Sequence, residues 1–149
     1  MSKGWIRKSK DSGRSLLLRS AFRKTMDGIV PHVNALGLTA ALAAWRDSED
    51  WRLALLDYLR ENRDHVEHFI SQTTVLNMSH VEATYLAWID CRTLPVDQPA
   101  RFFEQAGVGL SDGADFGAPG FVRLKFGCSR ALLAEAIARI DRAVSRLGL

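Results

Sequence analysis

The residue with the clearest capacity for chemistry in this sequence is Arg123, which lies between apolar neighbours in the segment FVRLKF. A guanidinium is planar and always charged, so it can bind a carboxylate through two parallel hydrogen bonds. Lys125 follows two positions later, and strand alternation would place it on the same face. On spacing alone, the favoured interpretation is a structural arginine that pairs with Asp90 or Asp112, because most arginines are structural or solvated.

Two histidines could contribute to a metal site. His65 and His68 lie three positions apart, with Glu61 and Asp64 nearby. A zinc site needs three or four converging ligands, and no third ligand follows at a persuasive spacing. A solvated helix face is therefore the favoured interpretation, and no metal ligand is predicted.

The two cysteines, Cys91 and Cys128, give neither a disulfide framework nor a zinc spacing. Cys91 and His80 would form a thiol–base pair only if the fold brought them together, and we predict instead small buried apolar cysteines. The sequence contains no Walker loop, no GxSxG and no HExxH. Motifs therefore predict no catalytic residue in this chain.

The elements that must position Arg123 follow from the hydrophobic periodicity. Helical spacing predicts helices near residues 16–27, 33–45 and 51–72, the last with an apolar stripe that begins at Trp51. The period then changes and predicts strands near residues 75–81, 85–91, 108–110 and 121–128, with a short helix over 100–106. Ser129 is expected to cap a last helix whose buried stripe consists of Leu132, Leu133, Ile137, Ile140, Val144 and Leu147.

Together these elements predict an α+β fold, in which helices pack on a small, mostly antiparallel sheet of three or four strands. We expect a basic, poorly ordered tail over residues 1–17, connecting helices over 18–72 and a small α+β domain over 73–149. The segment from Leu36 to Trp45 is apolar nearly all round and cannot bury itself alone. We therefore predict self-association or poor solubility for the isolated chain.

The run from Glu82 to Arg130, EATYLAWIDCR followed by VGLSDGADFGAPGFVRLKFGCSR, resembles the C-terminal small domain of the class I/II aminotransferase family of fold-type-I pyridoxal-phosphate enzymes. Within that family the likeness is to the bacterial cystathionine β-lyases, which are C–S β-lyases. It covers about the last seven-eighths of the chain and implies a long connecting helix before the small domain. The resemblance also implies that Arg123 binds the substrate α-carboxylate. Lys125 and Ser129 depart from the family pattern, where asparagine and proline are usual.

The same resemblance implies that the intact enzyme holds pyridoxal phosphate on a lysine of its large domain. Such an enzyme cleaves cystathionine or a related cysteine S-conjugate to a thiol, pyruvate and ammonia, or transfers an amino group. No lysine of this chain has a family-like context, the five being Lys3, Lys8, Lys10, Lys24 and Lys125. We therefore expect a truncated C-terminal domain that does not bind the cofactor by itself and is inactive alone. The alternative is a non-catalytic interaction module that docks on a full-length relative or a separate large domain, or forms a homo-oligomer.

The charge of the chain is uneven. Residues 1–24 carry a net charge of +7, and the other residues carry −4, since the whole chain has +3. Tail-driven nucleic-acid binding is an alternative, but the tail has no repeated basic and aromatic interleaving, so a solvated terminus is favoured. No signal peptide and no apolar run of membrane-spanning length is visible, and we expect a cytoplasmic protein without a membrane partner.

Overall fold

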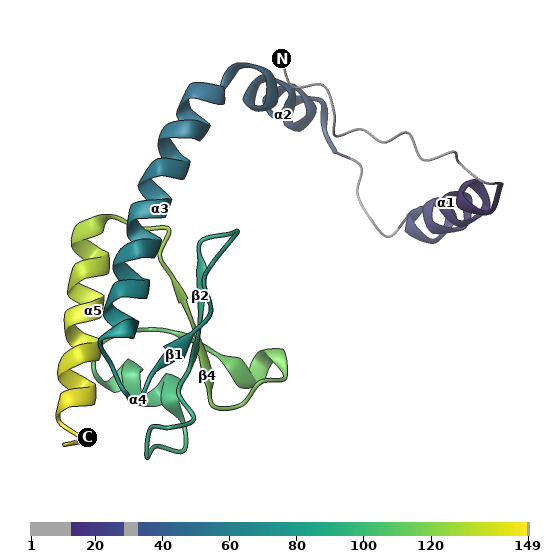
Figure 1. Ribbon diagram of the computed structural model, residues 1–149. Helices are drawn as coiled ribbons and strands as arrows, with labels where there is room; N and C mark the ends of the chain where they lie inside the picture. Colours follow the sequence, from purple (N-terminus) through teal and green to yellow (C-terminus); the bar gives the residue numbers. More distant parts are fainter. Residues whose placement is uncertain (1–12, 29–32, 149) are drawn as a thin grey trace. The chain divides into compact units, whose positions relative to one another are not determined.

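The computed structural model describes residues 13–28 and 33–148, and the chain forms two compact units, Met1–Ser48 and Glu49–Leu149. The first unit contains the helices α1 (Gly13–Met26) and α2 (Ala35–Asp47), and the second contains all the other elements (Figure 1). The basic tail was predicted over residues 1–17. Its residues 1–12 lie outside the described residues, and its last five belong to α1, which begins at Gly13.

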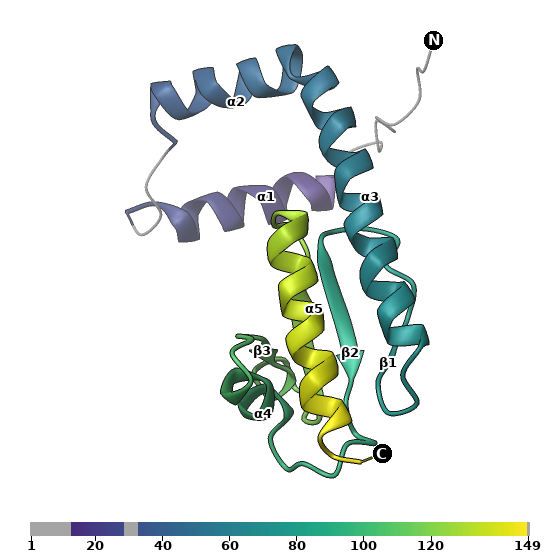
Figure 2. The ribbon, with the colours of Figure 1, turned by 90° about the vertical axis from the view of Figure 1, so that its left-hand side faces the viewer.

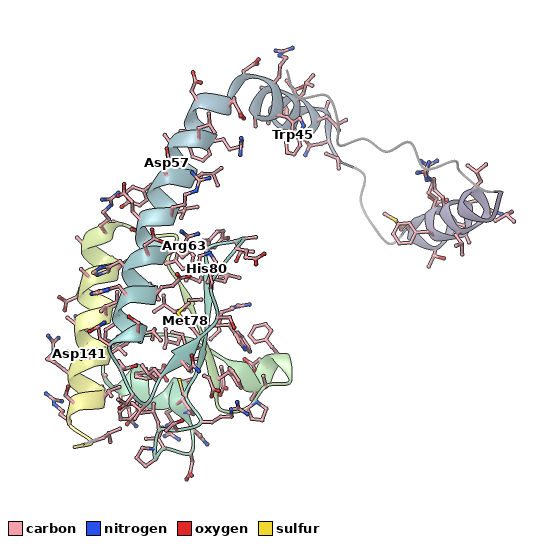
Figure 3. The ribbon with its side chains drawn as sticks, in the orientation of Figure 1. Trp45, Asp57, Arg63, Met78, His80 and Asp141 are labelled. Carbon is pink, nitrogen blue, oxygen red and sulfur yellow. The ribbon has the colours of Figure 1, made fainter. Side chains whose placement is uncertain are left out.

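The helix α2 begins at a capping residue. Asn34 has extended backbone angles, and its Oδ1 accepts a hydrogen bond of 2.7 Å from the Gly37 N–H, which satisfies a free amide of the first turn. No residue of α2 is buried, although the helix is mostly apolar. Trp45 is 94% exposed (Figure 3), and the other large exposed side chains of α2 are Leu36, Leu38 and Leu42.

The second unit is built on a four-stranded antiparallel sheet with the strand order β1-β2-β4-β3. Its strands are β1 (Asn77–Met78), β2 (Leu86–Asp90), β3 (Ser111–Asp112) and β4 (Phe121–Lys125). The register places Trp88 of β2 and Ser111 of β3 opposite Arg123, one on each side. The predicted α+β fold with a small antiparallel sheet is confirmed, and Arg123 lies on a central strand.

Two long helices, α3 (Glu49–Ser71) and α5 (Arg130–Ser145), lie side by side against one face of this sheet (Figures 1 and 2). Ser129 caps α5 as predicted, because its Oγ accepts a hydrogen bond from the Leu132 N–H at 3.3 Å. The short helix α4 (Pro99–Gln105) adds Phe103 to the same core. The sheet and the two long helices supply most of the remaining core, including Val66, Ile70, Ala87, Ile89, Val122, Leu124, Phe126, Leu133, Ile137 and Ile140.

The buried faces of the two long helices differ from the predicted stripes. Trp51 is 67% exposed, and the buried residues of α3 lie in its second half. Only that half contacts the sheet, since the first turns extend past it (Figure 1). In α5 the predicted Leu132 is 60% exposed, and the buried stripe consists of Leu133, Ile137, Ile140 and Ala143.

Three of the predicted strands are wrong in position or length. The strand expected over residues 75–81 is reduced to β1, Asn77–Met78. The strand expected over residues 108–110 is absent from the described structure, because the Val108 N–H bonds the Phe103 carbonyl and closes the end of α4. The strand expected over 121–128 ends at Lys125. Beyond it, the side-chain amide of Asn62 donates to the carbonyls of Phe126 at 2.8 Å and Cys128 at 3.0 Å. These carbonyls therefore bond to α3.

Candidate functional site

The sheet face turned away from α3 and α5 carries a layer of aromatic side chains. Strand alternation buries the residues on either side of Trp88 and leaves Trp88 on this face. Its ring stacks on Phe121 with the centroids 5.8 Å apart, and it meets Phe116 edge to face at 5.9 Å. Phe116 comes from the short 3-10 helix η1 (Gly113–Phe116), which covers this part of the face.

The turn that carries Phe116 is closely specified by its sequence. Asp112 caps η1, because its Oδ1 accepts a hydrogen bond of 3.0 Å from the Ala114 N–H. A side chain at Gly113 would collide with the carbonyl oxygens of Ala118 and Phe121, so only glycine fits there. Residues 111–116 thus form a short strand and a tight turn that hold Phe116 against the sheet.

Arg123 lies half-buried in the middle of this face. Its Nη2 donates a hydrogen bond of 3.3 Å to Ser111 Oγ, and its guanidinium carbon is 4.3 Å from the centroid of the Phe116 ring. Its Nε is buried and has no hydrogen-bond partner among the described residues. Because a buried donor without a partner is costly, this N–H is suited to an incoming acceptor.

The interpretation of Arg123 as one half of a structural ion pair is wrong for both predicted carboxylates. Asp90 accepts hydrogen bonds from Arg92, with 2.7 Å between Oδ2 and Nη2, and this bond holds the pKa of Asp90 below its usual range. Asp112 caps η1 instead. No salt bridge to Arg123 exists in the part of the chain that the structure describes. The guanidinium therefore remains available for a carboxylate from outside.

A cavity of about 450 Å³ opens beside Arg123. Lys125 also lines it, on the same face of β4 as predicted, since Val122 and Leu124 alternate with these residues and are buried. The remaining walls come from the loop over residues 107–110, Ser111, Leu124, Cys128 and α5. No aspartate or glutamate lines this cavity. Two cationic side chains and no acidic one therefore line this cavity.

The chain matches no protein-family model, but several curated proteins are similar to it. Protein MalY of Escherichia coli is 34% identical over 117 residues, which cover 74% of this chain. Cystathionine beta-lyase PatB of Bacillus subtilis is 31% identical over 119 residues, which cover 76%. The chain spans about a third of the length of these relatives, 30% and 31% respectively.

Solved structures show the same relationship. The structure of OvoB matches 87% of this chain and 34% of its own, with 46% identity and a TM-score of 0.84. Cystalysin of Treponema denticola, which contains pyridoxal 5′-phosphate, matches 87% of this chain and 35% of its own, with 25% identity and a TM-score of 0.78. The chain belongs to the aminotransferase-fold family of C–S lyases.

The cofactor of these C–S lyases does not fit the residues that the structure describes. The described lysines, Lys24 and Lys125, are both exposed. A lysine that forms a Schiff base needs a lowered pKa, which burial would give. The described part of the chain therefore offers no buried amine for pyridoxal phosphate.

The other candidate groups of the sequence do not form sites in this C–S lyase relative. His65 and His68 are exposed on α3, and residues 13–28 and 33–148 contain no cluster of three or more potential metal ligands. His80 lies beside the second half of α3 (Figure 3), where its Nδ1 is 3.0 Å from Glu67 Oε2. The Cys91 Sγ donates to the Ile89 carbonyl instead. His80 and Cys91 therefore share no hydrogen bond among the described residues, and the structure does not form the thiol–base pair.

Both cysteines are free and shielded, as predicted for Cys91, which is fully buried, while Cys128 is partly buried. Burial, together with the neighbouring Asp90 carboxylate, raises the pKa of the Cys91 thiol to about 12. Burial also raises the pKa of Cys128. A thiol with a raised pKa is a poor nucleophile near neutral pH, so neither cysteine is suited to catalysis.

The sequence did not reveal which residues surround Arg123. Alternation in the strand of Trp88 could have placed that ring on the same face as Asp90, but the register decides that it lies opposite Arg123. Ser111 and Phe116 gave no signal, because their approach depends on η1. None of the helices in the described ranges has the length and apolar character needed to cross a membrane.

Proposed function

We propose that this chain is the small domain of a pyridoxal-phosphate-dependent C–S β-lyase of the cystathionine β-lyase type, and that Arg123 binds the α-carboxylate of its amino-acid substrate. The observation that carries the proposal is the half-buried guanidinium with an unpartnered, buried Nε. The relatives named cystathionine beta-lyase support the reaction class. The alternative within the family is transfer of an amino group.

The environment of Arg123 supports a role in orienting substrate. Ser111 and Phe116 hold the guanidinium from two sides, and its buried Nε keeps a donor that no described residue uses. A carboxylate bound there through two hydrogen bonds has its direction defined as well as its position. The chain thus contributes binding and orientation to the reaction.

The chain by itself should be inactive. Cleavage of a C–S bond next to an amino-acid carbanion needs an electron sink, which pyridoxal phosphate supplies in enzymes of this kind. The lysine that would hold it must then come from a large domain, either a separate chain or a full-length relative. Because this domain would also complete the active site, we propose it as the partner of this chain.

The apolar surface of α2 supports such a partner. Leu36, Leu38, Leu42 and Trp45 are exposed on a helix whose only charged residues are Arg46 and Asp47 at its end. Exposed apolar patches of this kind mark interaction surfaces. The same surface favours the second candidate function, a non-catalytic interaction module, and predicts self-association of the isolated chain.

A chimera separates the two candidates. The segment of PatB that this chain matches, 119 residues, is replaced by the corresponding residues of this chain, and pyruvate release from cystathionine is measured. We expect an active chimera, in which Arg123→Lys lowers kcat/KM by about 10- to 100-fold, because lysine keeps the charge but loses the fork. The control is Arg92→Lys, on the same face but paired with Asp90, which should leave kcat/KM within about 2-fold. A folded but inactive chimera, or an Arg123→Lys chimera as active as its parent, would contradict the proposal.

A labelling experiment on the chain itself tests whether it holds the cofactor. The purified chain is mixed with pyridoxal phosphate, reduced with borohydride and mapped by mass spectrometry. We expect no site-selective labelling of any lysine. Stoichiometric modification of Lys24 or Lys125 would mean that the chain has its own cofactor site, and the inactivity that we propose would be wrong.

A further inference from the structure

A row of three aromatic rings on the sheet face turned away from α3 and α5 ends at Arg123. Phe121 stacks on Trp88 with the ring centroids 5.8 Å apart, and Trp88 meets Phe116 edge to face at 5.9 Å. The guanidinium carbon of Arg123 lies 4.3 Å from the centroid of the Phe116 ring. Resting on the proposed function, we infer that Phe116 is a positioning residue, whose aromatic ring holds this guanidinium in the orientation that binds a carboxylate.

The two ends of the row carry the same cationic group with different partners. At the far end, the guanidinium carbon of Arg92 lies 4.9 Å from the Phe121 centroid, and Arg92 is also paired with Asp90 at 2.7 Å. Arg123 has its ring contact but no carboxylate partner among the described residues. A ring attracts a cation without occupying its N–H groups. The guanidinium of Arg123 is thus held while its donors stay available for a ligand.

The ring holds the guanidinium more firmly than Ser111 does. The hydrogen bond from Arg123 Nη2 to Ser111 Oγ is 3.3 Å long, which is beyond the usual range for an N–H donor. A single hydrogen bond also leaves the planar group free to turn about it, and a ring packed against the group limits this rotation. The Nε, which is buried and has no partner in the described ranges, then keeps a fixed direction.

The sheet fixes the orientation of the Phe116 ring. Trp88 lies opposite Arg123 in the register of β2 and β4, and an edge-to-face contact is a preferred arrangement of two aromatic rings. Trp88 is itself stacked on Phe121 of β4. The cation and the rings that hold it therefore rest on the same two central strands.

The turn that carries Phe116 is explained by this role. Phe116 is 51% exposed, whereas the other phenylalanines of the unit Glu49–Leu149 are buried or half-buried. The turn closes at Gly117, whose φ of 77° favours glycine, and the Gly117 N–H donates to the Ala114 carbonyl at 3.0 Å. A half-exposed ring in such a defined turn contributes little to the core, but it lies against the guanidinium.

A spectroscopic test observes Arg123 directly in the purified chain. We expect its Nε–H signal in proton–nitrogen NMR spectra to be displaced by the ring current of Phe116 and to exchange slowly with water, since the Nε is buried. Phe116→Leu keeps an apolar side chain but removes the ring, so it should lose both properties. Phe116→Tyr keeps the ring and should retain both. The control Phe22→Leu, at an exposed phenylalanine of α1, should change neither.

A binding test uses acetate, which carries only the group that Arg123 is proposed to hold. Its affinity for the purified chain is measured by titrating the backbone amide signals around Arg123. We expect Phe116→Leu to weaken binding by about 3- to 10-fold, and Phe116→Tyr to stay within about 2-fold of the parent. Ser111→Ala should weaken binding less than Phe116→Leu does, because its hydrogen bond is long.

The outcomes separate this inference from the proposed function. If Phe116→Leu binds acetate as well as the parent does, while Arg123→Met does not bind it, Phe116 is not a positioning residue and the carboxylate site stands. If Arg123→Met binds acetate as well as the parent does, the carboxylate site itself is wrong, and the role of Phe116 fails with it. A parent spectrum in which the Arg123 Nε–H is neither displaced nor protected would overturn the role of Phe116 alone, and this result needs no variant.

Discussion

The two faces of the central sheet are made by the same strands but differ in the side chains that they present and in the elements that cover them. One face presents apolar side chains such as Ala87, Ile89 and Val122, all buried under α3 and α5. The other presents Trp88 and Arg123 under the short turn that carries Phe116. Because side chains alternate along a strand, each strand contributes to both faces. Stability and ligand binding should therefore be separable by substitutions one position apart.

The largest effect is expected on the packed face. Phe126 is almost fully buried in the core, and Phe126→Ala should lower the free energy of unfolding by about 3–5 kcal/mol through lost burial and a cavity. Urea denaturation followed by circular dichroism measures it. Leu132→Ala, at an exposed position of α5, is the matched control and should change stability by about 0.5 kcal/mol at most. Equal losses in the two variants would mean that this face does not carry the stability.

A polar residue connects the packed face to the helix above it. Asn62 is buried, and its amide bonds the carbonyls of Phe126 and Cys128. Asn62→Ala leaves both carbonyls without that donor and should cost about 1–3 kcal/mol in thermal or urea unfolding. Asn77→Ala, at an exposed asparagine, should cost far less. If Asn62→Ala lowered the free energy of unfolding by less than Asn77→Ala does, these hydrogen bonds would contribute no net stability.

Cys91 makes the packed face sensitive to alkaline pH. The fold raises the pKa of this thiol from 9.0 to about 12, so the unfolded chain loses its proton first. The stabilisation is complete below pH 9 and is lost as the pH rises toward 12, by about 1.4 kcal/mol between pH 8 and pH 10. Unfolding at these two values should show the loss in the parent chain, and Cys91→Ala should lack this contribution. An identical pH dependence in the two proteins would contradict the burial of the thiol.

The smallest change in stability is expected on the open face. Arg123→Met removes the interaction with Phe116 but also removes the buried Nε that has no partner in the described structure. The free energy of unfolding should change by less than about 1 kcal/mol, while carboxylate binding is lost. Thermal unfolding of Arg123→Met beside Arg92→Met measures this. A loss of several kcal/mol in Arg123→Met alone would make Arg123 structural and remove the contrast between the faces.

Part of the site was predictable because it depends on local rules. Alternation around Arg123 placed Lys125 on the same face, and the resemblance of the flanking residues singled out Arg123 before its surroundings were known. The partners of the aspartates were not predictable in this way. Asp90 pairs with Arg92, two residues away, and Asp112 accepts a hydrogen bond from a backbone amide. The prediction that one of these two aspartates pairs with Arg123 was therefore wrong for both.

The sequence by itself determined the α+β fold class, the helix capped by Ser129 and the alternation of the two central strands, because each depends on neighbours a few residues apart. Only the tertiary structure decided where α3 leaves the sheet, why Leu132 is exposed, and where β3 lies. It also decided that Trp88, Ser111 and Phe116 surround Arg123. These features depend on strand register and on contacts between distant segments, which local periodicity does not encode.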